Sequence, residues 1–285
     1  MVARSTTVTV VLLMAALFAV ERLVPLRRAG RPLIGRLLVN FGTSALAFGA
    51  AMLLVRPAAL YALGWSAEKS FGLIHVAPMP GGARFVLSFL LMDLTFYWWH
   101  VANHRIAFLW RFHNVHHIDP DLDVSTAFRF HFGEVALSTA FRVVQVGAIG
   151  LSAPAFAIYE LVFQANTLFH HSNVRLPIAI ERVLNLVLVT PRMHGIHHSE
   201  VRDETNSNYS VVFSWWDRLH RSACLNVPQS AIRVGVPAYA DPQDNTFGNT
   251  LTLPFRRQRD YWRRIDGTPV QRNPAAVDTS SRLAE

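Results

Sequence analysis

Four apolar stretches constrain the fold of this 285-residue chain more than any other feature of its sequence. A membrane-spanning helix needs roughly 20 mostly apolar residues, and residues 7–26, 37–55 and 85–101 each approach or reach that length. Residues 133–168 exceed one crossing and have a proline near their middle, so we expect a helical hairpin that turns around residues 150–154. Only 16% of the residues are charged, compared with about 25% in a typical soluble domain. The sequence therefore predicts an all-α integral membrane bundle of about four crossings.

The connections between these stretches indicate how the bundle is oriented. Short cytoplasmic loops carry an excess of basic residues, and the first loop contains Arg27, Arg28, Arg31 and Arg36. Residues 56–84 are weakly charged and contain several prolines and glycines, so we expect a non-cytoplasmic loop there, with His75 as an ordinary loop histidine. Residues 178–189 are too short and too interrupted by charge to cross, and we expect them to lie along the interface.

Histidines cluster after the third stretch and after the hairpin, which this topology places on the cytoplasmic face. Two histidines four residues apart share one face of a helix, because an α-helix has 3.6 residues per turn. Imidazole is the commonest metal ligand in proteins, and eight histidines are too many for one ion, so we expect a cytoplasmic cap that surrounds a pair of metals. The clusters have HxxxH or HxxHH spacing and are His100/His104, His113/His116/His117 and His194/His197/His198.

The residue types narrow the choice of metal and of protein class. Imidazole suits zinc, copper, iron and nickel. The sequence lacks both the Glu-x-x-His motif of soluble di-iron carboxylate proteins and the HExxH motif of zinc metalloproteases. The single cysteine, Cys224, excludes disulfide frameworks and cysteine-ligated iron–sulfur clusters within one chain.

Four segments resemble the integral-membrane fatty acid hydroxylase / sterol desaturase superfamily, namely LWRFHNVHHIDPDLDVSTAFRFH, FHHSNVRLP, TPRMHGIHHS and NYSVVFSWWDRL. The likeness covers residues 85–221. It implies a di-iron centre at the cytoplasmic ends of the membrane helices, which uses dioxygen and two external electrons to hydroxylate or desaturate a lipid. By match to the family pattern, the expected iron ligands are His100, His104, His113, His116, His117, His171, His194, His197 and His198.

Several aspartates near these segments have two interpretations each. Asp93 lies inside an apolar stretch, where a charged group is costly, and it is either functional or part of a helix–helix hydrogen bond. Asp119, Asp121 and Asp123 follow the second cluster. They either orient ligand imidazoles, which usually donate their second N–H to a carboxylate or carbonyl, or form a solvated turn.

Other residues match the family pattern less closely. His131 is interpreted as a structural residue or as one that supports the ligands, because phenylalanine follows it where the family usually has proline. His170 is either a histidine at a helix end in contact with water or an additional ligand. Family positions that hold the soluble cap against the metal site are matched by Arg129, Asn208, Tyr209, Trp216 and Asp217.

These interpretations divide the chain into N-terminal transmembrane helices at 1–84, a catalytic domain at 85–221 and a cytoplasmic extension at 222–285, whose last twenty or so residues look disordered.

A lipid hydroxylase is the leading interpretation. The alternatives are a desaturase on the same scaffold and a non-catalytic histidine-rich metal-binding membrane protein. The sequence has no nucleic-acid-binding module and no dinucleotide-binding or haem-attachment motif. We therefore expect electrons to come from a separate partner, such as a ferredoxin or a cytochrome with its reductase. The sequence specifies neither the lipid nor the oligomeric state.

Overall fold

The computed structural model describes residues 2–272 of the chain, with side chains from Thr7 onward. All regular secondary structure in this part is helical, and the only β pairing consists of isolated bridges. The all-α prediction is therefore confirmed. The expectation of disorder near the C-terminus falls largely on residues 273–285, which lie outside the described residues.

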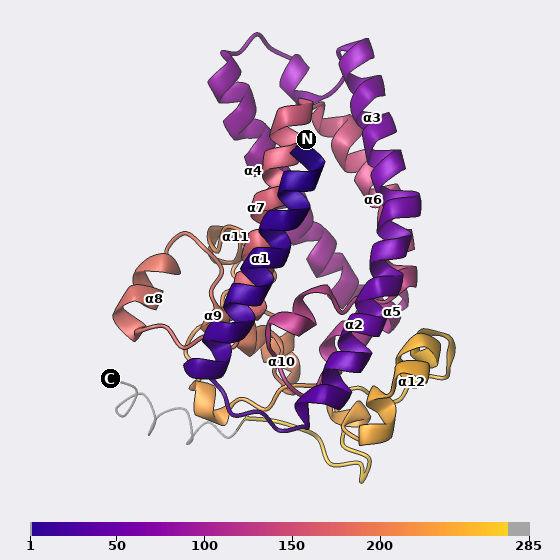
Figure 1. Ribbon diagram of the computed structural model, residues 1–285, viewed down its shortest axis with the longest axis vertical. Coiled ribbons are helices and arrows are strands. Elements are labelled where there is room, and N and C mark those ends of the chain that lie inside the picture. Colours follow the sequence, from indigo (N-terminus) through magenta and orange to yellow (C-terminus); the bar gives the residue numbers. More distant parts are fainter. Residues whose placement is uncertain (1, 273–285) are drawn as a thin grey trace.

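Long helices form the upper part of the molecule as drawn in Figure 1. They are α1 (Val2–Leu23), α2 (Leu33–Ala50), α3 (Arg56–Lys69), α4 (Gly81–Arg105), α6 (Phe132–Ile149) and α7 (Ala153–His171). Three stretches of the described chain are long and apolar enough to cross a membrane, namely Leu33–His75, Gly81–Arg105 and Phe132–Ile149. They support a membrane protein, whereas a total of four crossings stays a prediction.

Short helices gather at one end of the long ones (Figure 1). They are α5 (Ala107–His117), α8 (Ile178–Leu184), α9 (Pro191–His197), α10 (Arg202–Thr205), α11 (Trp215–Leu219) and α12 (Phe247–Thr252). Single 3-10 turns occur at Leu73–His75, Val124–Phe128, Gln229–Ala231, Pro237–Tyr239, Pro242–Asn245 and Leu253–Phe255. Residues 200–272 cover this end of the bundle (Figure 1).

The predicted loop at residues 56–84 is wrong over its first half, because the helix continues to Lys69. Pro57 stands in the first turn of α3. Proline has no backbone N–H to donate to the preceding turn, and the helix adjusts through a π-helical segment, Ala51–Val55, immediately before it. Only residues 70–80 connect α3 to α4, and they contain one 3-10 turn.

The predicted hairpin is confirmed, with its turn between α6 and α7. Gly150 adopts a left-handed conformation with φ of 76°, which costs glycine little. A Cβ atom at this position would also lie 2.4 Å from the carbonyl oxygen of Phe71. His75 contributes a 3.1 Å hydrogen bond from Nε2 to the Gly150 carbonyl. The 70–80 connection and the hairpin turn therefore fasten together the end of the bundle opposite the short helices.

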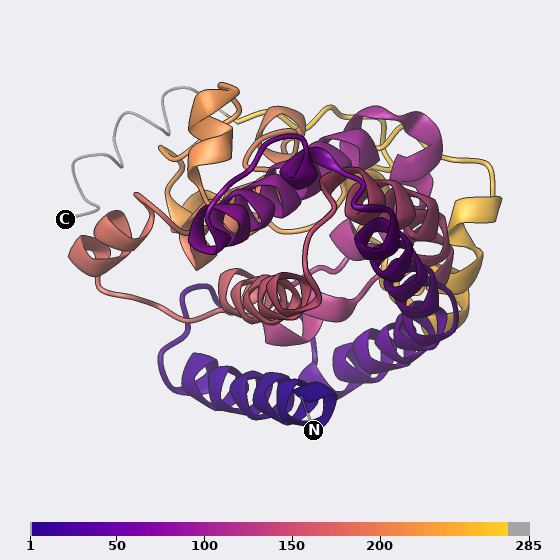
Figure 2. The same ribbon diagram turned by 90° about the horizontal axis from the view of Figure 1, so that it is seen from above.

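The helices pack around α7, which lies centrally when the molecule is seen from above (Figure 2). α1 packs along α7, α3 along α6, and α4 against both α6 and α7. Their shared core includes Met92 and Tyr159, both fully buried. By contrast, large apolar side chains such as Leu12, Leu38 and Leu53 are exposed on the outer helix surfaces. An apolar exterior of this kind suits contact with lipid.

Asp93 connects α4 to the chain that follows the third histidine cluster. Its buried carboxylate accepts hydrogen bonds from the backbone N–H groups of Val212 and Phe213, the indole of Trp216 and the hydroxyl of Tyr159. Asp93 therefore joins the helical bundle to the 212–216 segment and makes no contact with the histidines. Of its two interpretations, the structural one is supported.

An Asp93→Asn variant is expected to be less stable, because an amide replaces one acceptor oxygen with a donor that faces other donors. Leaving one buried donor unsatisfied costs about 1–3 kcal/mol. We expect a lower thermal unfolding midpoint in detergent, measured by intrinsic fluorescence, with the iron content of the folded fraction unchanged. An unchanged midpoint would contradict this structural role.

Candidate metal centre

Nine histidines from four regions of the chain meet where the long helices end. They come from the C-terminal half of α4, from α5, from the end of α7, and from α9 with the residue after it. They form two groups, within each of which the available ring nitrogens all lie within 4.8 Å of one another. The first group is His100, His104, His113, His117 and His197, and the second is His116, His171, His194 and His198. The structure thus brings together all nine histidines expected as ligands.

Backbone carbonyls fix the rings of two histidines in the first group. His100 donates from Nδ1 to the Tyr209 carbonyl at 2.7 Å, and His197 donates from Nδ1 to the Ser207 carbonyl at 2.6 Å. A carbonyl oxygen only accepts, so Nδ1 carries the proton in each neutral ring and Nε2 keeps a free lone pair. This arrangement of the second ring nitrogen is typical of metal-bound histidine.

Glu134 fixes the ring of His113, and no sequence pattern indicated this role. This carboxylate in the first turn of α6 accepts from His113 Nδ1 at 2.9 Å, and both residues are buried. The only signal in the sequence was a single acidic residue at the start of a long apolar stretch. A carboxylate partner fixes the orientation of the imidazole and makes its Nε2 a stronger donor to a metal.

We expect a Glu134→Gln variant to fold and to bind metal more weakly. Loss of such a partner typically lowers metal affinity by about 10–100-fold. Competition with a chelator, followed by metal analysis of the protein, measures this change. Glu160→Gln is the matched control, because Glu160 pairs with Arg142 and contacts no histidine. Equal metal affinity in the Glu134 variant and the control would show that the carboxylate does not support the site.

The second group converges through its Nε2 atoms. The Nε2 atom of His171 lies 3.1 Å from the Nε2 of His116 and 3.0 Å from the Nε2 of His194. The Nε2 atoms of His194 and His198 are 3.1 Å apart. His171 donates from Nδ1 to the Thr167 carbonyl at 2.8 Å, so its Nε2 offers a lone pair to the others. Four imidazole nitrogens that converge in this way are suited to coordinate one cation.

The unsatisfied nitrogens show that the nine residues fit a metal. Buried polar atoms normally have hydrogen-bond partners, yet Nε2 of His104, His113, His117 and His197 has none within the described chain. Burial, followed by the charge of neighbouring histidines, lowers the pKa of His117, His194 and His198 well below the usual value. These imidazoles are therefore neutral at pH 7, as a metal ligand must be, and an all-imidazole set suits iron, zinc, copper or nickel.

His170 and His131 belong to neither group. His170 is buried, and its ring centroid lies 4.2 Å from that of His194, so the expectation of a water-contacting histidine is wrong. Its Nδ1 meets the Asn166 amide at 3.3 Å. His131 caps α6 by accepting from the backbone N–H of Gly133, and its Nε2 donates to the Leu251 carbonyl. Both ring nitrogens of His131 are therefore engaged with backbone groups, which supports the structural interpretation.

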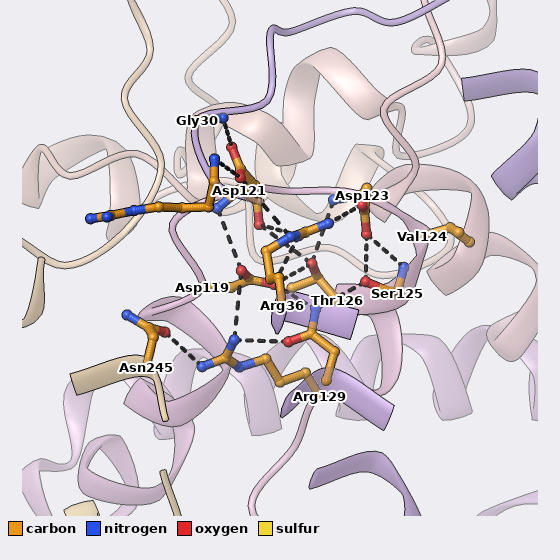
Figure 3. Close-up of polar contacts among 12 residues, drawn as sticks. Gly30, Arg36, Asp119, Asp121, Asp123, Val124, Ser125, Thr126, Arg129 and Asn245 are labelled. Carbon is orange, nitrogen blue, oxygen red and sulfur yellow. Dashed lines mark hydrogen bonds and ion pairs between the residues drawn. The ribbon is translucent and has the colours of Figure 1, made fainter. Parts of the chain in front are cut away.

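The aspartates after the second cluster do not orient imidazoles, contrary to one of their two interpretations. Nor do they form a solvated turn, because Asp119 and Asp123 are buried. As Figure 3 shows, they surround Arg36 of α2, which is 3.2 Å from Asp119 and also contacts Asp123. Arg129 lies on the other side of Asp119, at 3.6 Å. This ionic cluster holds the turn that follows α5 against α2.

Asp217 supports the first group indirectly. Its carboxylate accepts from the backbone N–H groups of Tyr209 and Ser210 at 2.8 and 2.9 Å, and from the hydroxyl of Ser222. It therefore fixes the backbone segment whose Tyr209 carbonyl holds His100. Asp217 contacts no histidine within the described chain, and its hydrogen bonds hold the 209–222 segment in place.

Comparison with known proteins identifies relatives of the region that contains all nine histidines. The fatty acid hydroxylase family model matches residues 85–222. The ornithine lipid hydroxylase OlsE of Rhizobium tropici is 32% identical over 140 residues, which are 49% of this chain and 41% of the relative. Human alkylglycerol monooxygenase is 30% identical over 46% of this chain and 28% of its own length.

A cholesterol 25-hydroxylase-like protein of Danio rerio is 26% identical over 51% of this chain and 59% of its own length. The chain thus matches less than two thirds of the length of each of these relatives. No solved structure matches the chain. Residues 85–222, which contain all nine histidines, are thus similar to the fatty acid hydroxylase family, in agreement with the resemblance to the fatty acid hydroxylase / sterol desaturase superfamily.

Proposed function

We propose that this protein is a membrane-bound, non-haem di-iron oxygenase that hydroxylates a C–H bond of a lipid. One observation carries the proposal, namely two adjacent groups of five and four histidines, all buried except the half-buried His100, with ring nitrogens within 4.8 Å of one another in each group. The match of residues 85–222 to the fatty acid hydroxylase family supports the same chemistry. The reaction would consume dioxygen and two electrons from a separate donor, such as a ferredoxin or a cytochrome with its reductase.

The histidines of the first group would hold one iron and those of the second group the other. With iron bound there, these histidines would support the activation of dioxygen, the chemistry needed to insert one oxygen atom into an unactivated C–H bond. The protein positions the ligands through the Nδ1 bonds of His100, His197 and His113. Burial of the histidines excludes bulk water, which protects reactive species from side reactions.

An aromatic layer between α4, α6 and α7 supports a lipid as the substrate. Phe96 precedes His100 by one helical turn and so shares its face of α4. The Phe96 ring lies 4.5 Å from that of Phe163, and the Trp99 ring stacks on that of Phe141 at 4.7 Å. The relatives are named for ornithine lipid, alkylglycerol and cholesterol. An acyl or alkyl chain would approach the metals through this apolar region.

We place the metal centre on the cytoplasmic face because the arginine-rich turn between α1 and α2 lies at the same end of the molecule. An electron donor in the cytoplasm would then have access to the histidine-bearing end. This orientation can be tested by labelling single cysteines introduced near Arg28 with an impermeant thiol reagent. Protection in intact cells and labelling in broken cells is the expected pattern.

The activity test uses the iron-loaded protein in lipid nanodiscs with ferredoxin, its reductase and isotope-labelled dioxygen. We expect a lipid product that carries one labelled oxygen atom. A product with a new double bond and no label would instead support a desaturase on the same scaffold. Absence of any product from an iron-loaded protein, across acyl lipids, alkylglycerols and sterols, would favour a non-catalytic metal-binding protein.

A further inference from the structure

An open cavity of about 380 Å³ lies beside the metal-binding end but outside both histidine groups. The turn between α1 and α2 forms one wall, the turn after α5 a second, and the segment around residues 232–240 a third. Figure 1 shows the α1–α2 turn at the same end of the molecule as the segments drawn in orange to yellow before residue 273. Nothing in the proposed oxygenase chemistry uses this cavity.

The cavity carries an excess of positive charge. Seven arginines and three carboxylates line it. Arg22 pairs with Asp123 at 2.8 Å, and Arg36 also pairs with Asp123. Arg264 pairs with Glu200 at 2.8 Å. The carboxylates are thus already engaged by a subset of the arginines.

The remaining arginines have no carboxylate of their own. Arg28 is exposed, and its side chain makes no hydrogen bond or ion pair within the part of the chain that is described. The guanidinium of Arg31 donates to the Ala240 carbonyl at 3.0 Å. Arg233 is exposed and lies 3.8 Å from Glu200, which Arg264 already occupies. A concave surface lined by one sign of charge concentrates counter-ions.

The third carboxylate, that of Asp121, is also occupied. It accepts the backbone N–H groups of Gly30 and Arg31 at 2.6 and 2.9 Å, and so fixes the α1–α2 turn that presents these arginines (Figure 3). The site is therefore shaped by the fold before any ligand arrives. Leu23, immediately before the turn, is 80% exposed at the end of α1. The cavity accordingly lies next to apolar surface that suits lipid.

We propose that this cavity binds an oxyanion, a phosphate or carboxylate group, through the arginines that the protein's own carboxylates leave free. Guanidinium groups bind such anions with paired, charge-assisted hydrogen bonds. The anion comes either from a lipid headgroup or from a soluble phosphate. This site is separate from the metal centre, so the inference does not depend on the oxygenase activity.

The test compares an Arg28→Gln/Arg233→Gln variant with an Arg256→Gln/Arg257→Gln control. Both variants lose two exposed arginines, but only the first pair lines the cavity. Purified protein in neutral detergent is titrated calorimetrically at constant ionic strength with inorganic phosphate and with dihexanoyl phosphatidylglycerol. We expect one saturable site per chain, with affinity lowered at least about tenfold in the cavity variant and unchanged in the control.

The two probes distinguish the source of the anion. Binding of phosphatidylglycerol alone assigns the site to a lipid headgroup, whereas comparable binding of phosphate assigns it to a soluble oxyanion. Either result supports the cavity as an oxyanion site. Equal loss of affinity in the two variants, or no saturable binding of either probe, would overturn it. Circular dichroism and unfolding midpoints verify that both variants are folded.

Discussion

Replacing His194 with alanine is expected to abolish lipid hydroxylation and to remove iron from the second histidine group. The Nε2 of His194 lies 3.0 Å from that of His171 and 3.1 Å from that of His198. His194 therefore stands between other members of the group. Loss of a residue that only supports a ligand already lowers metal affinity or activity by about 10–100-fold. Loss of a ligand itself should exceed that, so we expect product formation to fall by more than about 100-fold.

His220→Ala is the matched control for this variant. His220 belongs to neither histidine group, and its ring stacks on that of Tyr97 with centroids 4.7 Å apart. We expect its iron content to equal that of the wild-type protein. Iron is measured by mass spectrometry of the purified protein, and product by mass spectrometry of extracted lipids. Retention of full iron and activity in the His194 variant would exclude this residue as a ligand.

An Arg129→Met variant should show the largest loss of stability. Arg129 is fully buried and donates to the Val115 carbonyl at 3.1 Å and to the side chains of Asn40 and Asn245 at 2.8 and 2.9 Å. Its charge also faces Asp119 at 3.6 Å. Removing one partner from a buried ionic cluster costs about 3–5 kcal/mol, because the remaining charge is left uncompensated.

The Arg129 variant should also bind metal poorly, since Val115 lies in α5 between histidines of the two groups. The measurements are the thermal unfolding midpoint in detergent and the iron content of the fraction that remains folded. An Arg129→Lys variant keeps the charge but not the planar fork of donors, so we expect an intermediate midpoint. A methionine variant as stable as the wild-type protein would show that the ionic cluster does not hold this part of the fold.

Spacing alone predicted eight of the nine histidines, because the spacing within each cluster matches the helix repeat. His100 and His104 lie on one helix, α4, and the HxxHH clusters fall on the short helix α5 and on α9 with the residue that follows it. The family pattern added His171, which its own neighbourhood in the sequence does not mark. Local periodicity and family likeness were therefore sufficient to assemble the histidine set.

The sequence was a poor guide to which polar residues accompany these histidines. Asp119 is only two residues from His117, yet α5 ends there and the carboxylate turns towards Arg36, 83 residues earlier in the chain. Conversely, Glu134 reaches His113 across 21 residues. Such pairs depend on how the helices pack, which no short-range pattern specifies.

Pro57 is hard to interpret from sequence for a different reason. Proline is common in loops, but it is also tolerated in the first turn of a helix, and here it stands at the start of α3. The neighbouring π-helical segment Ala51–Val55 accommodates the missing backbone hydrogen bond of the proline. A single residue type thus fits both a loop and a helix start, and only the packing of α3 along α6 decides between them.

The central claim, that the two histidine groups hold a pair of irons, is tested most directly by metal analysis combined with Mössbauer spectroscopy. The protein would be purified in mild detergent from cells grown with enriched iron. We predict about two irons per chain, with the spectrum of a magnetically coupled pair in nitrogen-rich coordination. One metal ion per chain, none, or two zinc ions in a protein that accepts no iron would contradict the proposed centre.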